Sequence, residues 1–103
     1  MERIKDSVKK YLCSLAHHLK PVVLIGKNGI NDKVIGSVDI ALQVHELIKV
    51  KFGEFKEVKK EISLEIAGIT KSELIGIIGN IVIFYRQHLE PEKRKIKIPY
   101  GHE

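Results

Sequence analysis

A four-residue segment, Gly26-Lys27-Asn28-Gly29, carries the residue types best suited to bind an anion. Glycines let a backbone approach a phosphate closely, and the free amides at the start of a following helix favour negative charge. Lys27 adds a point charge. The pattern of a P-loop and the three glycines of a dinucleotide site are both absent, so nucleotide hydrolysis or hydride transfer is not indicated. A second Gly-x-x-Gly, 76–79, has an apolar middle that is typical of a strand.

The positive charge of the chain is concentrated near its two ends. The formal net charge is +5, and residues 1–33 carry a net +4, residues 34–85 a net −1 and residues 86–103 a net +2. A basic segment of this kind suggests a polyanionic partner. Charge alone leaves a lysine-rich, merely solvated surface as an equal alternative.

A first helix, capped by Asp6 or Ser7 and ended by Pro21, is expected to position part of this charge. Three- and four-residue spacing predicts one apolar stripe, made of Ile4, Val8, Leu12, Leu15 and Leu19. The opposite arc is basic and holds Lys5, Lys9, Lys10, His17 and Lys20. Cys13 lies at the edge of this arc and is expected to be inert, because it is the only cysteine.

The remaining periodicities predict an α/β layered domain with a four-stranded mixed sheet, in the order α-β-α-β-α-β-β. The expected elements after the first helix are a strand at 22–25, a helix from Asn31 or Asp32 to about His45, a strand at 47–52, a third helix marked by Phe55, Val58, Ile62, Ile66 and Ile69, and strands at 73–79 and 81–86. Gly79-Asn80 is typical of a tight hairpin turn between the last two. Lys49 and Lys51 alternate with apolar residues and predict a solvated sheet face.

The tail after Pro91 is left open between a frayed extension and a short edge strand. We expect one domain over residues 1–103, with a basic tail from about residue 87. No apolar run approaches the length of a membrane span, and the N-terminus has no signal region. With one cysteine, these features suggest a cytoplasmic protein.

The histidines do not predict catalysis or metal binding. His17 and His18 are adjacent, so on a helix they point about 100° apart and cannot share one ion as neighbours at i and i+4 can. His45 is expected on the apolar face of the second helix as a structural residue. Because no nucleophile is paired with a base, we expect no enzyme activity, no metal and no cofactor.

Three blocks of sequence resemble the CRM domain, named for chloroplast RNA splicing and ribosome maturation. The blocks are 16–29, which ends in the Gly-x-x-Gly loop, then 41–42 with 45–51, and then 78–86. The resemblance implies a fold similar to the C-terminal domain of translation initiation factor three. It also implies a stand-alone prokaryotic type that binds ribosomal RNA in the large-subunit precursor. In the family the loop contacts RNA, which maps here onto Gly26, Lys27, Asn28 and Gly29.

The sequence therefore predicts an RNA-binding protein that acts in ribosome assembly, with ribosomal proteins as further partners and neither a membrane nor a small-molecule substrate. The first helix and the loop are expected to form one continuous basic surface. Predicted RNA contacts besides the loop are Lys5, Lys9, His17, His18, Lys20, Lys33 and Arg86. The aromatic residues are not paired as on an RRM sheet, so phosphate contacts are expected to dominate over base stacking. A protein-interaction module of a ribosome-assembly or RNA-processing complex is the alternative, weakened by the lack of an obvious apolar patch.

Overall fold

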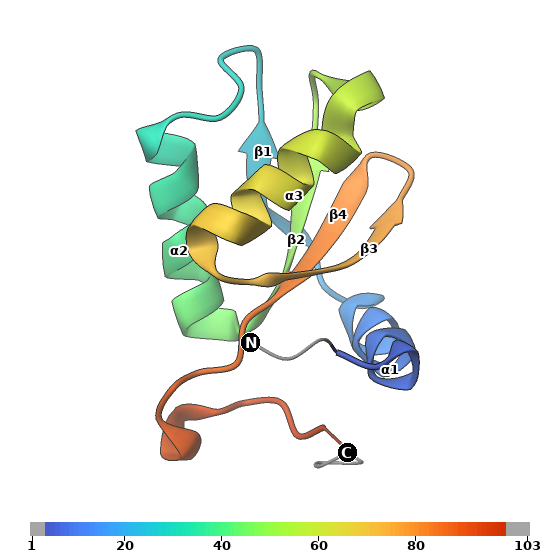
Figure 1. The fold of residues 1–103 in the computed structure, drawn as a ribbon, viewed down its shortest axis with the longest axis vertical. Coiled ribbons are helices and arrows are strands. Elements are labelled where there is room, and N and C mark those ends of the chain that lie inside the picture. The colour runs from blue at the N-terminus through green and yellow to red at the C-terminus, as the bar shows by residue number, and fades with distance from the viewer. Residues whose placement is uncertain (1–3, 99–103) are drawn as a thin grey trace.

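The computed structural model describes residues 4–98 and shows a four-stranded sheet with helices on both faces (Figure 1). The helices are α1 (Asp6–Ala16), α2 (Asp32–His45) and α3 (Lys59–Thr70), and the strands are β1 (Pro21–Ile25), β2 (Leu47–Phe52), β3 (Glu73–Ile78) and β4 (Ile81–Tyr85). The strand order is β1-β2-β4-β3. β1 and β2 are parallel, whereas β4 runs antiparallel to both of its neighbours. The predicted mixed sheet and element order are confirmed.

The larger core lies between the sheet and the pair α2 and α3. Alternate residues of β2 point into it, so Ile48, Val50 and Phe52 are buried against Leu42 of α2 and Ile66 of α3. Asn31 begins α2, since its side-chain oxygen accepts a hydrogen bond from the Val34 amide at 2.8 Å. This cap and the end of α2 at His45 are as predicted.

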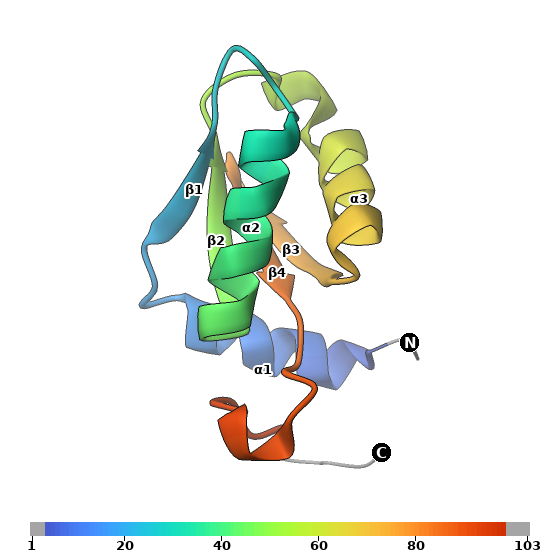
Figure 2. The same ribbon diagram turned by 90° about the vertical axis from the view of Figure 1, so that its left-hand side faces the viewer.

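The other face of the sheet is covered by α1 at one end, so the prediction of a solvated face is wrong there (Figure 2). Val8, Leu12 and Ala16 of α1 form a second core with Leu47 of β2 and Ile83 of β4. Cys13 belongs to this contact as well, because a Cβ atom on Gly76 would lie 3.1 Å from its sulfur. Cys13 therefore faces the sheet and not the basic arc.

Helix α1 ends four residues before the predicted stop at Lys20. At its end the helix changes to a tighter turn, in which the His17 amide donates to the carbonyl of Ser14, three residues earlier, at 3.3 Å. Lys49 of β2 then binds the end of the turn, because its ammonium donates to the carbonyls of Leu19 at 3.0 Å and His17 at 3.4 Å. Leu15 and Leu19 are exposed and do not complete the predicted apolar stripe. Lys49 has a structural role that the alternation of β2 did not predict.

The third helix begins later than its apolar spacing predicted. Phe55 has the left-handed backbone conformation, with φ +58°, and is followed by a short 3₁₀ turn, Lys56–Val58. Only Ile62 and Ile66 of the predicted stripe face the core, whereas Phe55, Val58 and Ile69 are exposed. Phe55 is thereby available outside the core.

The C-terminal segment is neither frayed nor an edge strand within the described residues. It forms a 3₁₀ turn, Pro91–Lys93, and Ile96 and Ile98 then pack against the second core, below α1 in Figures 1 and 2. The buried carboxylate of Glu46 holds this segment in place. It accepts hydrogen bonds from the amides of His88 at 2.6 Å, Lys95 at 2.7 Å and Ile96 at 3.0 Å.

Replacing Glu46 is expected to release the C-terminal segment. In Glu46→Gln one of the two acceptor oxygens becomes a donor that faces an amide, and in Glu46→Ala three amides lose their acceptor. Because each buried amide without an acceptor costs about 1–3 kcal/mol, Glu46→Ala should lower the free energy of unfolding by several kcal/mol and Glu46→Gln by less. Urea unfolding measures the loss, and limited trypsin cleavage at 93–95 should accelerate in the same order. Equal stability of all three proteins would contradict this role.

Burial, and to a lesser extent the nearby Glu46 charge, raises the pKa of the Tyr85 hydroxyl from 10.0 to about 12, whereas Arg94 opposes the shift. The hydroxyl is buried with no hydrogen-bond partner among residues 4–98. The unfolded chain therefore loses this proton first as the pH rises, so stability falls between pH 10 and 12. We expect wild type to lose on the order of 2 kcal/mol more than Tyr85→Phe across this window. Urea unfolding of both proteins at pH 9 to 12 measures the difference, and parallel curves would exclude the shift.

Candidate nucleic-acid interface

The Gly26–Gly29 loop lies at the end of β1 and forms a tight turn before α2. The Gly29 amide donates to the Gly26 carbonyl at 3.0 Å, and Gly29 has φ +64°, a conformation that strongly favours glycine. Gly29 is buried, whereas Lys27 and Asn28 are exposed at the tip. The turn therefore presents these two residues to solvent on a constrained backbone.

Free backbone amides are available at this tip. They belong to the loop itself and not, as expected from the sequence, to the start of α2. Among residues 4–98 no acceptor is bonded to the amides of Lys27 and Asn28. The start of α2 is less favourable to an anion, because Asn31 occupies the Val34 amide and Asp32 adds a negative charge. The loop itself, with the Lys27 ammonium, is thus the better anion site.

A second loop lies beside the first. The carbonyl of Ile25, the last residue of β1, accepts hydrogen bonds from the amides of Gly53 at 3.0 Å and Glu54 at 3.3 Å. The ring of Phe55 then packs on Gly29, where an added Cβ atom would lie 3.4 Å from the ring carbon Cε2. The two loops accordingly form one end of the domain, with a half-exposed aromatic ring between them. The periodic pattern placed Phe55 in a helix, so its part in this surface was missed.

The predicted basic residues of the first helix lie at the other end of the sheet. Figures 1 and 2 both show α1 at the foot of β1 and the loop at its top. β1 has five residues, so at about 3.3 Å per residue it alone places roughly 16 Å between the loop and the turn that follows α1. The structure therefore separates Lys5, the N-cap residue of α1, and Lys9 of α1 from the loop.

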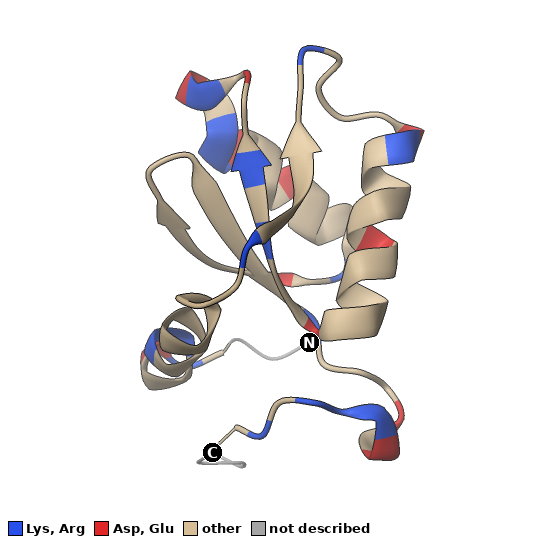
Figure 3. Cartoon of the chain, turned by 180° about the vertical axis from the view of Figure 1, so that it is seen from behind, with Lys and Arg blue, Asp and Glu red and all other residues tan. Residues whose placement is uncertain are grey.

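Basic side chains nevertheless occur along the path between the two groups. Figure 3 shows Lys and Arg on α1, at the start of β1, along β2 and at the tip of the loop. Lys20 precedes β1 and is exposed, and Lys49 and Lys51 lie on β2, with Lys51 exposed. Any continuous basic surface must run along these two strands. Lys33, at the first turn of α2, lies near the loop instead.

His17 and His18 lie in the turn that follows α1 and are both exposed. Their rings contact each other edge to face, with centroids 5.2 Å apart. The basic turn formed by these two residues and Lys20 is fixed to β2 by Lys49. Their contact with RNA stays a prediction.

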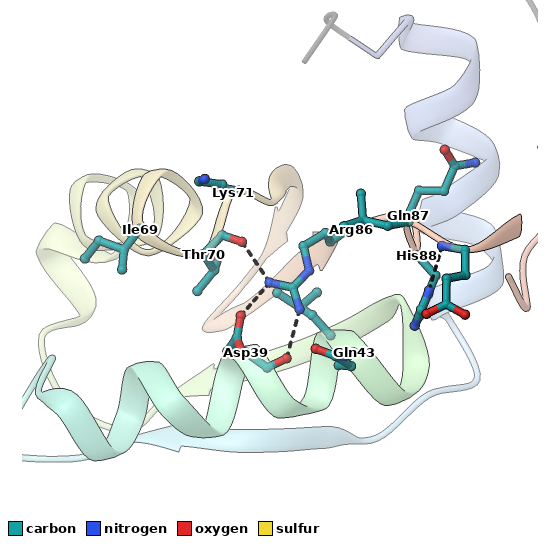
Figure 4. Close-up of a pocket in the computed structure, with 11 residues that line it drawn as sticks. Asp39, Gln43, Ile69, Thr70, Lys71, Arg86, Gln87 and His88 are labelled. Atoms are coloured by element: carbon teal, nitrogen blue, oxygen red, sulfur yellow. Dashed lines mark hydrogen bonds and ion pairs between the residues drawn. The ribbon is translucent and has the colours of Figure 1, made fainter. Parts of the chain in front are cut away.

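Arg86 lies far from the loop, in a hollow of about 600 Å³ between α2, the end of α3 and the segment after β4 (Figure 4). Its guanidinium donates to the Asp39 carboxylate at 2.6 Å, to the Asp39 carbonyl at 3.0 Å and to the Thr70 carbonyl at 2.8 Å. These bonds join α2, α3 and β4. The structure thus gives Arg86 a structural role and does not bring it to the other predicted RNA contacts.

A smaller hollow of about 320 Å³ lies between α1 and the C-terminal segment. His45, expected on the buried face of α2, is exposed and lines it with Leu15, Leu19 and Ile96. Within residues 4–98 no group of three or more His, Cys, Asp or Glu is placed to hold a metal ion. The same residues contain no helix long and apolar enough to cross a membrane.

The sequence of this chain matches a known family over all of its strands and α-helices. The family model of the CRS1 / YhbY (CRM) domain matches residues 4–86, which include every strand and helix that forms the sheet and its two covering layers. The chain therefore belongs to the CRS1 / YhbY (CRM) domain family.

Individual relatives are similar in sequence to this chain over nearly its whole length. A protein of Haemophilus influenzae named "RNA-binding protein" is 40% identical over 100 residues, which is 96% of this chain and 98% of that protein. The "Probable RNA-binding protein YqeI" of Bacillus subtilis is 35% identical over 92 residues, covering 88% and 94%. A solved structure of a hypothetical protein from Staphylococcus aureus superposes with a TM-score of 0.76 at 35% identity, covering 92% of this chain and 100% of that one.

Proposed function

We propose that this protein binds RNA without catalysing a reaction, and that the Gly26–Gly29 loop makes the central contact. The observation that carries the proposal is the exposed pair Lys27 and Asn28, whose amides have no acceptor among the described residues. A phosphate at this tip can accept from backbone amides and from the Lys27 ammonium together. The family membership and the names of the relatives support RNA as the polyanion.

The proposed footprint extends from the loop along β1 and β2. Lys33 follows the loop in the first turn of α2, and Lys51 and Lys49 of β2 and Lys20 before β1 lead toward Lys5 and Lys9 at the start of α1. Such a row of cations contacts phosphates along the backbone and positions the RNA without reading its sequence. Affinity should therefore depend strongly on salt.

The proposed target is ribosomal RNA of the large-subunit precursor, and the proposed role is that of a cytoplasmic factor in ribosome assembly. The resemblance to stand-alone CRM proteins supports both. A basic tip together with a row of lysines along β1 and β2 fits a folded RNA that presents several phosphates to one side of the protein.

A protein-interaction module stays the second candidate, and one observation favours it. Across the uncovered end of the sheet the register aligns Leu24, Lys51, Ile81 and Ile78 in one row. Leu24 and Ile78 are 60% and 61% exposed. The row is apolar at both edges of the sheet with Lys51 within it, and a ribosomal protein could contact it beside bound RNA.

Binding of the purified protein to large-subunit ribosomal RNA across a salt series tests the proposal. Lys27→Gln removes the loop charge and should weaken binding several-fold at low salt. It should also reduce the slope of log K against log salt by roughly 0.7–0.9, as expected for one lost phosphate contact. Asn28→Asp places a negative charge on the tip and should weaken binding more strongly.

Lys71→Gln is the matched control, because Lys71 is also exposed but lines the hollow around Arg86. It changes the net charge by the same amount and should leave affinity and slope nearly unchanged. Urea unfolding checks that each variant is folded. If the wild type does not bind at low salt, or if Lys27→Gln and Lys71→Gln bind equally, the loop is not the central contact.

A further inference from the structure

Phe55 is an aromatic residue that the fold leaves outside its core. It is 41% exposed and adopts φ +58° and ψ +34°. For a residue other than glycine this conformation is unfavourable, and for a bulky side chain it is uncommon. Backbone strain of this kind often accompanies functional sites. Here the left-handed conformation of Phe55 keeps its ring out of the apolar face of α3, where the apolar spacing of the sequence had placed it.

The ring lies against the candidate anion site. Its edge carbon Cε2 is 3.4 Å from the position that a Cβ atom would occupy on Gly29, and Cζ is 3.6 Å from it. Hydrogen bonds from Gly53 and Glu54 to Ile25 fix the two loops to each other at the end of β1. The ring and the Lys27–Asn28 tip are therefore held at a defined separation, which is a condition for one ligand to contact both.

We infer that Phe55 stacks on an unpaired base of the RNA whose backbone is held at the Gly26–Gly29 loop. The bases of a continuous duplex are stacked on each other, whereas those of loops and bulges can be splayed out onto aromatic side chains. The ligand class is thus a single-stranded loop or bulge within folded RNA. This inference rests on the proposed function and makes its substrate more specific.

The charges around Phe55 fit this division of roles. Lys56 is exposed next to it, but Glu54 and Glu57 flank the pair and offset its charge. The second loop therefore adds little attraction for phosphate, so its contribution to affinity comes from the ring. Stacking is less sensitive to salt than phosphate contacts are, and this difference separates the two loops experimentally.

Two RNA probes and two variants test the inference. The probes are a hairpin with an unpaired uridine-rich loop and a fully paired duplex of the same length. Phe55→Leu keeps an apolar cover on Gly29 but removes the aromatic face, and Phe55→Tyr keeps the ring. Phe55→Leu should bind the hairpin at least about fivefold more weakly with an unchanged salt slope, whereas Phe55→Tyr should bind like wild type. Binding of the duplex should be the same for all three.

A spectroscopic variant reports stacking directly. The chain contains no tryptophan, so Phe55→Trp introduces a single indole whose fluorescence a stacked base quenches. We expect quenching by the hairpin and little by the duplex. The fluorescence of Phe55→Trp can be measured whether or not Phe55→Leu folds, so the inference stays testable if Phe55→Leu fails to fold.

The outcomes separate the inference from the function on which it rests. Failure of the wild type to bind large-subunit ribosomal RNA as well as both probes would overturn both, whereas binding of that RNA but of neither probe would overturn stacking alone. Normal binding of the hairpin by wild type and equally by Phe55→Leu, without quenching in Phe55→Trp, would overturn stacking and leave RNA binding at Lys27 intact.

Discussion

The buried carboxylate of Glu46 is the constraint on which the organisation of this domain depends. Glu46 stands between α2 and β2 with φ +65°, and its carbonyl accepts the Arg86 amide at 2.8 Å where β4 ends. Its side chain binds three amides of the C-terminal segment. Through one residue, the turn from helix to strand, the end of the central antiparallel pair and the tail are held together. A charge this deeply buried is tolerated because backbone donors surround it.

This arrangement gives the two ends of the sheet different roles. At the Glu46 end, charged groups bind within the fold: Arg86 is bound by Asp39 and Thr70, Glu46 binds the tail, and the tail covers the second core. At the other end, the β1–α2 loop and the loop after β2 carry exposed groups, namely Lys27, Asn28 and the ring of Phe55. The sheet serves as a rigid support that keeps these loops in register, as binding residues are commonly placed on loops over a stable scaffold.

Much of the fold could be predicted because its signals are local. The alternation of β2, the Asn31 cap and the Gly79-Asn80 turn each depend on a few neighbouring residues, and all three are present. Contacts between distant residues could not be predicted in this way. The Glu46 carboxylate binds amides 42 to 50 residues away, and the Lys49 ammonium binds carbonyls 30 and 32 residues away. These pairings set the end of α1 and the position of the tail.

The candidate site was likewise predicted only where its signals are local. The glycine spacing located the loop, and the structure gives Gly29 the positive φ that such a turn requires. The helical wheel assigned Lys20 and His17 to the face of one helix, but that helix ends at Ala16. Periodicity placed Phe55 in the α3 stripe, since spacing alone does not reveal a left-handed residue. Arg86 looked like a free cation at a strand end because its partner Asp39 is 47 residues away.

The central claim is that RNA contacts the loop end of the sheet and not the Glu46 end. Ultraviolet crosslinking of the protein to large-subunit ribosomal RNA, followed by mass spectrometry of the crosslinked peptides, tests this most directly. We predict crosslinks within residues 26–33 and 53–56, with weaker ones along 17–20 and 49–51. Crosslinks confined to residues 71–98, around the Arg86 hollow and the tail, would contradict the account.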